Sequence, residues 1–285
     1  MQSKNPEGVP LQRIKSADEV ELTEANIHTT PVSCGSLIIN ADDWGRDNQT
    51  TNRILECFQR RALSSASGMV FMEDSERAAT IATEQGLDIG LHLNLSSPFS
   101  ANQIPSALAS HHQKVSEYLL AHCSARLLYH PKLANSFEYV VACQFEEFIR
   151  LYGKAPDRID GHHHMHLSAN VLLQKLLPSG TIVRRHFSYE SGEKLVRNSV
   201  FRLFSRTLLG GRYRLTDFFF SLPPFASAAR MQRIFTLARR FVVEIETHPI
   251  NPGEYRFLTE GNFRRWTGDR PPALTFATAS ALQRA

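Results

Sequence analysis

The chain alternates between short apolar runs and segments with helical spacing, and this order constrains its fold more than any other feature. The runs that indicate buried strands cover residues 36–40, 68–72, 88–95, 181–183 and 241–249. Between them lie segments whose apolar residues recur every three to four positions. One of these, residues 137–152, ends at Gly153, as helices often do. Strands and helices in alternation favour a parallel α/β sheet or barrel with helices on its outside.

Size and charge limit the class of protein. A length of 285 residues with 42% hydrophobic residues fits one large α/β domain. A formal net charge of +4 is too small to predict a nucleic-acid partner. Residues 1–33 are polar and show no clear period, so we expect an N-terminal extension there and one folded domain over residues 34–285.

Cysteine usage and the ends of the chain bear on the compartment. The four cysteines are scattered and form no C-x-x-C pair, which favours reduced thiols in a cytoplasmic protein. The first residues contain no apolar segment typical of a secretory signal. No run of 18 apolar residues is present, so no membrane-spanning helix is expected.

The stretch from Asp160 to His166 contains four histidines within five positions, in a chain with 12 histidines in all. A polar turn and the apolar Ile159 precede it, as at the end of a strand. On a strand, Asp160, His162 and His164 would share one face, whereas a helix would align His162 with His166. Either geometry gathers imidazoles, so we expect a metal site, although the spacing leaves open which histidines bind. The paired His111 and His112 lack such a context and are interpreted as solvated.

Other polar residues lie at the ends of predicted strands. Asp42 and Asp43 follow residues 36–40, His92 lies within residues 88–95, and His248 closes the last strand before a proline. The carboxyl ends of parallel strands meet at one face of an α/β fold, so these side chains are expected to converge. A carboxylate with two histidines suits Zn²⁺, Mn²⁺, Fe²⁺ or Co²⁺. A second carboxylate and a separate histidine could then act as base and acid, which is the chemistry of metal-assisted amide or ester hydrolysis.

Four motifs, in order along the chain, resemble those of the YdjC-like carbohydrate deacetylases, the group that contains chitooligosaccharide deacetylase. N-A-D-D-W-G at residues 40–45 resembles N-A-D-D-F-G, and G-L-H-L-N-L at residues 90–95 is identical to a family motif. D-G-H-H-H-M-H at residues 160–166 resembles D-S-H-x-H-x-H, and residues 244–249 resemble E-x-x-x-H-P. The resemblance covers residues 36 to 282. Trp44, Gly161 and Ile250 depart from the usual residues.

The resemblance implies a distorted TIM-like (β/α) barrel in a single domain and removal of an N-acetyl group from a sugar. Asp43, His92 and His162 would bind the metal, with Asp42 as general base and His248 as general acid. The implied ion is Mg²⁺, whereas the two histidines suit Zn²⁺ or another transition metal. The implied partner is an N-acetylated carbohydrate: an oligosaccharide, a glycolipid or a natural-product glycoside. A homodimer is compatible with the sequence.

Two other functional classes stay open. A related metal hydrolase could act on a phosphoester, with Arg184 and Arg185 as the phosphate clamp, and a non-catalytic relative could bind sugar alone. Residues 194–214 contain six basic residues and no acidic one, interleaved with bulky apolar side chains. This segment is either a packing helix with a basic face or a peripheral contact with a membrane or a lipid-linked substrate.

Overall fold

The computed structural model describes residues 35–260 except 123, 189–202, 204–206 and 224–227, and all statements below concern these residues. Seven parallel strands form one sheet in the order β5-β4-β3-β2-β1-β7-β6. The strands are β1 (Ser36–Trp44), β2 (Ser65–Gly68), β3 (Ile89–Leu93), β4 (Arg158–Gly161), β5 (Ile182–Val183), β6 (Phe218–Ser221) and β7 (Val242–Thr247). The predicted α/β class with a parallel sheet is confirmed.

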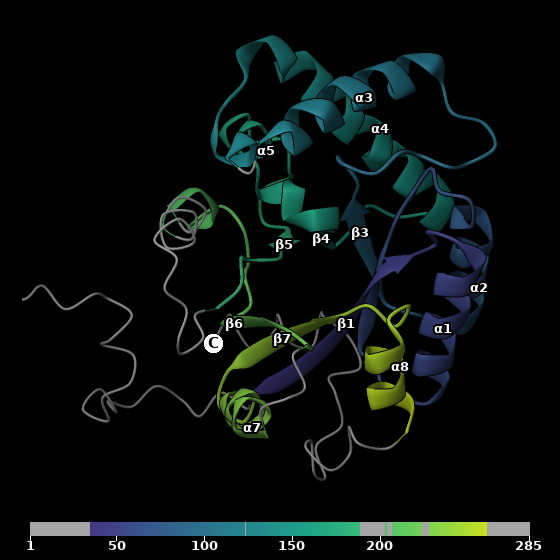
Figure 1. The fold of residues 1–285 in the computed structure, drawn as a ribbon, viewed down its shortest axis with the longest axis vertical. Helices are drawn as coiled ribbons and strands as arrows, with labels where there is room; N and C mark the ends of the chain where they lie inside the picture. Colours follow the sequence, from purple (N-terminus) through teal and green to yellow (C-terminus); the bar gives the residue numbers. More distant parts are fainter. Residues whose placement is uncertain (1–34, 123, 189–202, 204–206, 224–227, 261–285) are drawn as a thin grey trace, which may run out of the picture. The chain divides into compact units, whose positions relative to one another are not determined.

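Helices connect the strands and cover the sheet (Figure 1). They are α1 (Asn48–Gln59), α2 (Ser75–Gln85), α3 (Ser106–Ala121), α4 (Ala134–Tyr152), α5 (Ala169–Leu173), α7 (Ala228–Leu237) and α8 (Pro252–Thr259), with 3₁₀ turns η3 (Ala125–Leu127), η4 (Pro131–Leu133) and η5 (His162–Leu167). The side chain of Asp47 accepts a hydrogen bond from the Thr50 amide at 2.8 Å and so begins α1. Gly153, at φ 70°, ends α4 as its spacing predicted. Helices α3 and α4 pack on each other, and α1 packs on α8.

The two faces of the sheet differ in chemistry. Strand alternation places Leu37, Ile39 and Ala41 on the outer face, where they join the main apolar core. Asn40 and Asp42 lie on the inner face. The strand register aligns them with further polar residues on neighbouring strands, namely Ser65, Ser67, His92, Asp160, Glu244 and Glu246. The inner face of this sheet is therefore a buried polar surface.

The sheet is strongly curled. Four strand spacings, roughly 19 Å in a flat sheet, separate β5 from β1, yet Arg184 after β5 contacts Asp42 of β1 at 2.7 Å. The chain beyond β5 also reaches β6, because the Ser188 amide donates to the Phe219 carbonyl at 2.8 Å. The predicted distorted barrel is therefore confirmed as a half-barrel of seven parallel strands.

Some local predictions were wrong. The second strand covers Ser65–Gly68, so the apolar residues 69–72 form a buried connection instead of a strand. Strand β6 was not predicted at all. No helix in the described ranges is long and apolar enough to cross a membrane. Residues 1–33 and most of the basic segment 194–214 lie outside the described residues, as does the tail after 260.

Candidate metal and acid–base site

The end of β1 supplies two carboxylates to the same site. Consecutive strand residues point to opposite faces, so Asp43 should point outward if Asp42 points inward. The pairing of β1 with β2 shifts register between Ala41 and Trp44, and Asp43 adopts φ 71°. A positive φ is unfavourable for a residue other than glycine, although aspartate tolerates it better than most. This local irregularity turns both carboxylates toward the inner face.

Three ligand atoms converge beside Asp43. Its Oδ1 lies 3.0 Å from His162 Nδ1 and 3.4 Å from His92 Nε2. All three residues are buried, and neither Asp43 Oδ1 nor His92 Nε2 has a hydrogen-bond partner in the described part of the chain. Burial alone would raise the pKa of Asp43, but its contacts with the two imidazoles hold that pKa well below its usual value. This buried Asp-His-His triad could hold a metal ion.

Asp160 orients His92 from behind. Its Oδ1 lies 2.8 Å from His92 Nδ1, which leaves Nε2 directed at Asp43. Such a carboxylate–histidine contact fixes the tautomer that ligates a metal through the other nitrogen. Burial lowers the pKa of His92, but the charges of Asp42 and Asp160 outweigh it and raise the pKa to about 10. The site therefore carries surplus negative charge that favours a bound cation.

The histidine-rich stretch is neither a strand nor a regular helix. Strand β4 ends at Gly161, and η5 follows with His163 and His164 at φ 54° and 57°. This backbone sends the histidines in different directions. His162 faces Asp43, His164 Nε2 lies 3.7 Å from Glu246, and His166 Nε2 bonds to the Arg184 carbonyl at 3.0 Å. Within this stretch, only His162 belongs to the triad.

Arg184 is the centre of a buried ion network. Its guanidinium contacts Asp42 at 2.7 and 2.8 Å, and it also reaches Asp160 at 2.9 Å and Glu244 at 2.8 Å. Burial would raise the pKa of Asp42, but Arg184 and His92 lower it below its usual value. Burial raises the pKa of Glu246 well above its usual value, and the charge of Asp42 adds to this shift. The network therefore keeps Asp42 anionic and fixes its orientation.

His248 faces Asp42 from the end of β7. Its Nε2 lies 4.0 Å from Asp42 Oδ2, and its side chain is 32% exposed. The structure thus brings together all five residues that the sequence singled out for chemistry: Asp42, Asp43, His92, His162 and His248. Sequence reasoning assigned Arg184 only a possible role as a phosphate clamp and assigned Glu246 no role. Arg184 follows a strand of only two residues, so no pattern pointed to its position.

Residues 36–267 match the YdjC family, described as YdjC-like protein. This chain belongs to the YdjC-like family. The motif resemblance is thereby confirmed. Two homologues of this YdjC-like protein are chitooligosaccharide deacetylases. The one from Serratia marcescens is 30% identical over 136 residues, which are 47% of this chain and 52% of the relative. The one from Yersinia pestis strain Pestoides F is 30% identical over 132 residues, which are 46% of this chain and 50% of the relative.

The chain therefore spans about half the length of the curated relatives that it matches. A solved structure extends the comparison of the fold. It is the crystal structure of a protein from Enterococcus faecalis V583, named as a candidate cellobiose-phosphate cleavage protein. The YdjC-like chain is 18% identical to it, with a TM-score of 0.59 over 86% of this chain and 98% of the other. This likeness supports the fold.

Proposed function

We propose that this YdjC-like protein is a metal-dependent hydrolase that removes the acetyl group from an N-acetylated sugar. Asp43, His92 and His162 hold a divalent metal, Asp42 is the general base and His248 is the general acid. The observation that carries the proposal is the convergence of three buried ligand atoms next to a carboxylate and an imidazole 4.0 Å apart. Homology to chitooligosaccharide deacetylases supports the substrate class.

The donor set fits a divalent ion. Two imidazoles and one carboxylate suit Zn²⁺ or another transition metal better than Mg²⁺, which prefers oxygen ligands. An ion bound there supplies Lewis-acid chemistry: it polarises the amide carbonyl and lowers the pKa of water. The unpartnered buried atoms Asp43 Oδ1 and His92 Nε2 support this assignment, because buried polar atoms without partners are costly.

The remaining steps fall to the side chains. Arg184 holds Asp42 as an anion, ready to accept the proton of the attacking water. The lower pKa makes Asp42 a weaker base, and the bidentate contact offsets this with fixed orientation. His248, 4.0 Å from Asp42, donates a proton to the amide nitrogen as the C–N bond breaks. Water is thereby divided between the two products, acetate and a free amine on the sugar.

The phosphoester alternative has less support. Arg184 is buried, and its guanidinium contacts Asp42, Asp160 and Glu244, so it does not face a substrate. Arg185 donates to the Thr216 and Asp217 carbonyls. A purely sugar-binding role has no use for an anionic carboxylate held 4.0 Å from an imidazole.

Acetate release from a panel of free and lipid-linked N-acetylated sugars tests the proposal. We expect release from at least one sugar, loss on metal chelation and recovery when a divalent ion is restored. Asp42→Asn should retain the metal and lower kcat by roughly 10²–10⁴-fold, the range for a lost general base. Loss of metal from Asp42→Asn would reverse the roles of the two aspartates. Turnover of phosphoesters without any acetate release would instead favour the alternative.

A further inference from the structure

The loop that carries His248 is held from the inside by one buried carboxylate. Glu254, in the first turn of α8, accepts hydrogen bonds from the His248 amide and the Thr247 hydroxyl through Oε2, both at 2.8 Å. Its Oε1 accepts from the Asn251 side chain at 2.8 Å. Glu254 is buried, and each of these bonds ends on the short segment that leads from β7 into α8. Its carboxylate therefore holds the His248 amide before Pro249 and the Asn251 side chain after it.

A second residue holds the same loop from outside. Arg53 of α1 donates through Nη1 to the Ile250 carbonyl at 2.7 Å and the Pro249 carbonyl at 3.4 Å. Its guanidinium lies over the Tyr255 ring, 5.1 Å from the ring centre. Carbonyls in a tight loop are often left to water, and a cation that bonds both of them restricts the loop's movement. The loop is thus held by a carboxylate from α8 and a guanidinium from α1, which we call the clamp.

The clamp bonds to His248 through its main-chain amide, and to the neighbouring residues through two carbonyls and two side chains. The proposed chemistry instead needs the His248 side chain in place. His248 Nε2 lies 4.0 Å from Asp42 Oδ2, and its side chain is partly exposed. The position of its ring thus depends on where the loop holds the backbone. A shift of about 1 Å in a reacting group can cost on the order of 10²-fold in rate.

We propose that Arg53 and Glu254 are positioning residues. They hold the His248 backbone so that the imidazole ring lies where it can donate its proton. The inference rests on the proposed function, because it assigns a cause to the action of the general acid. Ile250 departs from the family motif, but Arg53 bonds to its main-chain carbonyl, an atom that every residue type supplies.

Two substrates with different leaving groups separate positioning from general damage. Cleavage of an N-acetylated chitooligosaccharide expels an amine, which needs a proton, whereas 4-nitrophenyl acetate expels a phenolate that leaves without one. We expect Glu254→Ala and Arg53→Met to lower kcat on the amide by roughly 10–10²-fold, with KM, metal content and ester turnover unchanged. Glu254→Gln keeps an oxygen acceptor for the His248 amide and should restore most of the amide activity.

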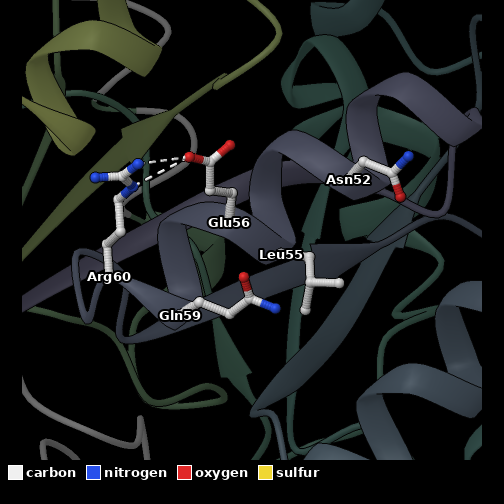
Figure 2. Close-up of a pocket in the computed structure, with 5 residues that line it drawn as sticks. All are labelled: Asn52, Leu55, Glu56, Gln59 and Arg60. Atoms are coloured by element: carbon white, nitrogen blue, oxygen red, sulfur yellow. Dashed lines mark hydrogen bonds and ion pairs between the residues drawn. The ribbon is translucent and has the colours of Figure 1, made fainter.

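Glu56 provides the matched control. It lies on α1 beside Arg60, among the residues that line the pocket in Figure 2, and it accepts hydrogen bonds from the Arg60 guanidinium and the Tyr255 hydroxyl. It belongs to the same contact between α1 and α8, but none of its hydrogen bonds reaches residues 248–251. Glu56→Gln should weaken this contact without an amide-selective loss.

The outcomes separate the inference from the proposed function. In the first case, His248→Ala loses amide turnover selectively, but Glu254→Ala and Arg53→Met either lose amide and ester turnover equally or lose neither. The positioning role is then wrong, and the general acid stands. If His248→Ala itself shows no selectivity for the amide, the assignment of the acid fails first. Should Glu254→Ala not fold, the ratio of amide to ester turnover in Arg53→Met, with Arg53→Lys as its conservative partner, decides the question alone.

Discussion

The same strands form both faces of the curled sheet, but the outer face is apolar and the inner face is charged. On the outer face, Leu37, Ile39 and Leu91 pack into one continuous apolar core. On the inner face, Asp42, Asp160 and two glutamates of β7 surround a single guanidinium, that of Arg184. Apolar burial stabilises the fold at about 25 cal/mol per Å², whereas buried ion pairs contribute little net stability. The outer face thus supports the fold, and the inner face serves the chemistry.

The inner face, unlike the outer face, buries several carboxylates close together. Four carboxylates near one guanidinium cannot all ionise cheaply in a buried site. Burial raises the pKa values of Glu244 and Glu246, while Arg184 helps to lower those of Asp42 and Asp160. The pKa values are thus lowered for the carboxylates that border the triad and raised for those on β7. A cation held by the triad, as proposed, would add positive charge beside Asp43 and His92.

Removing Arg184 should break the inner face most severely. Arg184→Met leaves Asp42 and Asp160 buried without their countercharge, and we expect a loss of about 3–5 kcal/mol in the free energy of unfolding. Urea denaturation measures it. The neighbouring Arg185→Met is the control, because Arg185 bonds to two backbone carbonyls and should cost only about 1 kcal/mol. Equal losses in the free energy of unfolding of the two variants would show that the buried ion network contributes no more to stability than ordinary hydrogen bonds do.

An outer-face substitution should affect stability alone. Leu91 is fully buried in the main core on β3, next to His92 but on the opposite face. Leu91→Ala should lower the free energy of unfolding by about 3 kcal/mol, within the usual range for a buried leucine. The folded fraction should keep its metal content and its kcat. A large fall in kcat with full metal content would mean that the two faces are not separable.

The smallest expected effect concerns a histidine in the apolar layer. His112 is buried on α3, its ring centre 4.3 Å from that of Phe99, and burial lowers its pKa to about 4. Between about pH 6.5 and 4, His112 is protonated in the unfolded chain but neutral in the folded one. The stability that comes from burying neutral His112 is therefore complete above about pH 6.5 and is lost as the pH falls toward 4. When the pH is lowered from 7 to 4.5, the free energy of unfolding of His112→Phe should fall by about 2 kcal/mol less than that of the parent protein. Identical pH dependence in both proteins would refute this.

The apolar pattern predicted much of the fold because the outer face is apolar on most strands. Residues 36–40, 88–95 and 241–249 were found in this way and became β1, β3 and β7. Strand β2 was misplaced because its sequence, S-A-S-G, has low strand propensity. Its serines face inward, where Ser65 bonds to Asn40, and Ser67 to Asp160. Such a strand is stabilised by partners that lie far away in the sequence.

The candidate site was predicted in composition but not in geometry. The motifs named Asp42, Asp43 and His92, yet no local pattern indicates that Asp43 takes a positive φ to reach the inner face. His112, interpreted as solvated, is buried, because an amphipathic helix of residues 106–121 was not recognised in its full length. Arg184 could not be predicted, because its partners come from three other strands.

The central claim is that the inner face holds a divalent metal through Asp43, His92 and His162. Anomalous diffraction at the zinc edge from crystals grown with Zn²⁺ tests it most directly. One strong peak should lie within about 2.0–2.2 Å of Asp43 Oδ1, His92 Nε2 and His162 Nδ1, and it should vanish in Asp43→Asn. A peak bound by His164 and His166, with His162 turned away, would contradict the account.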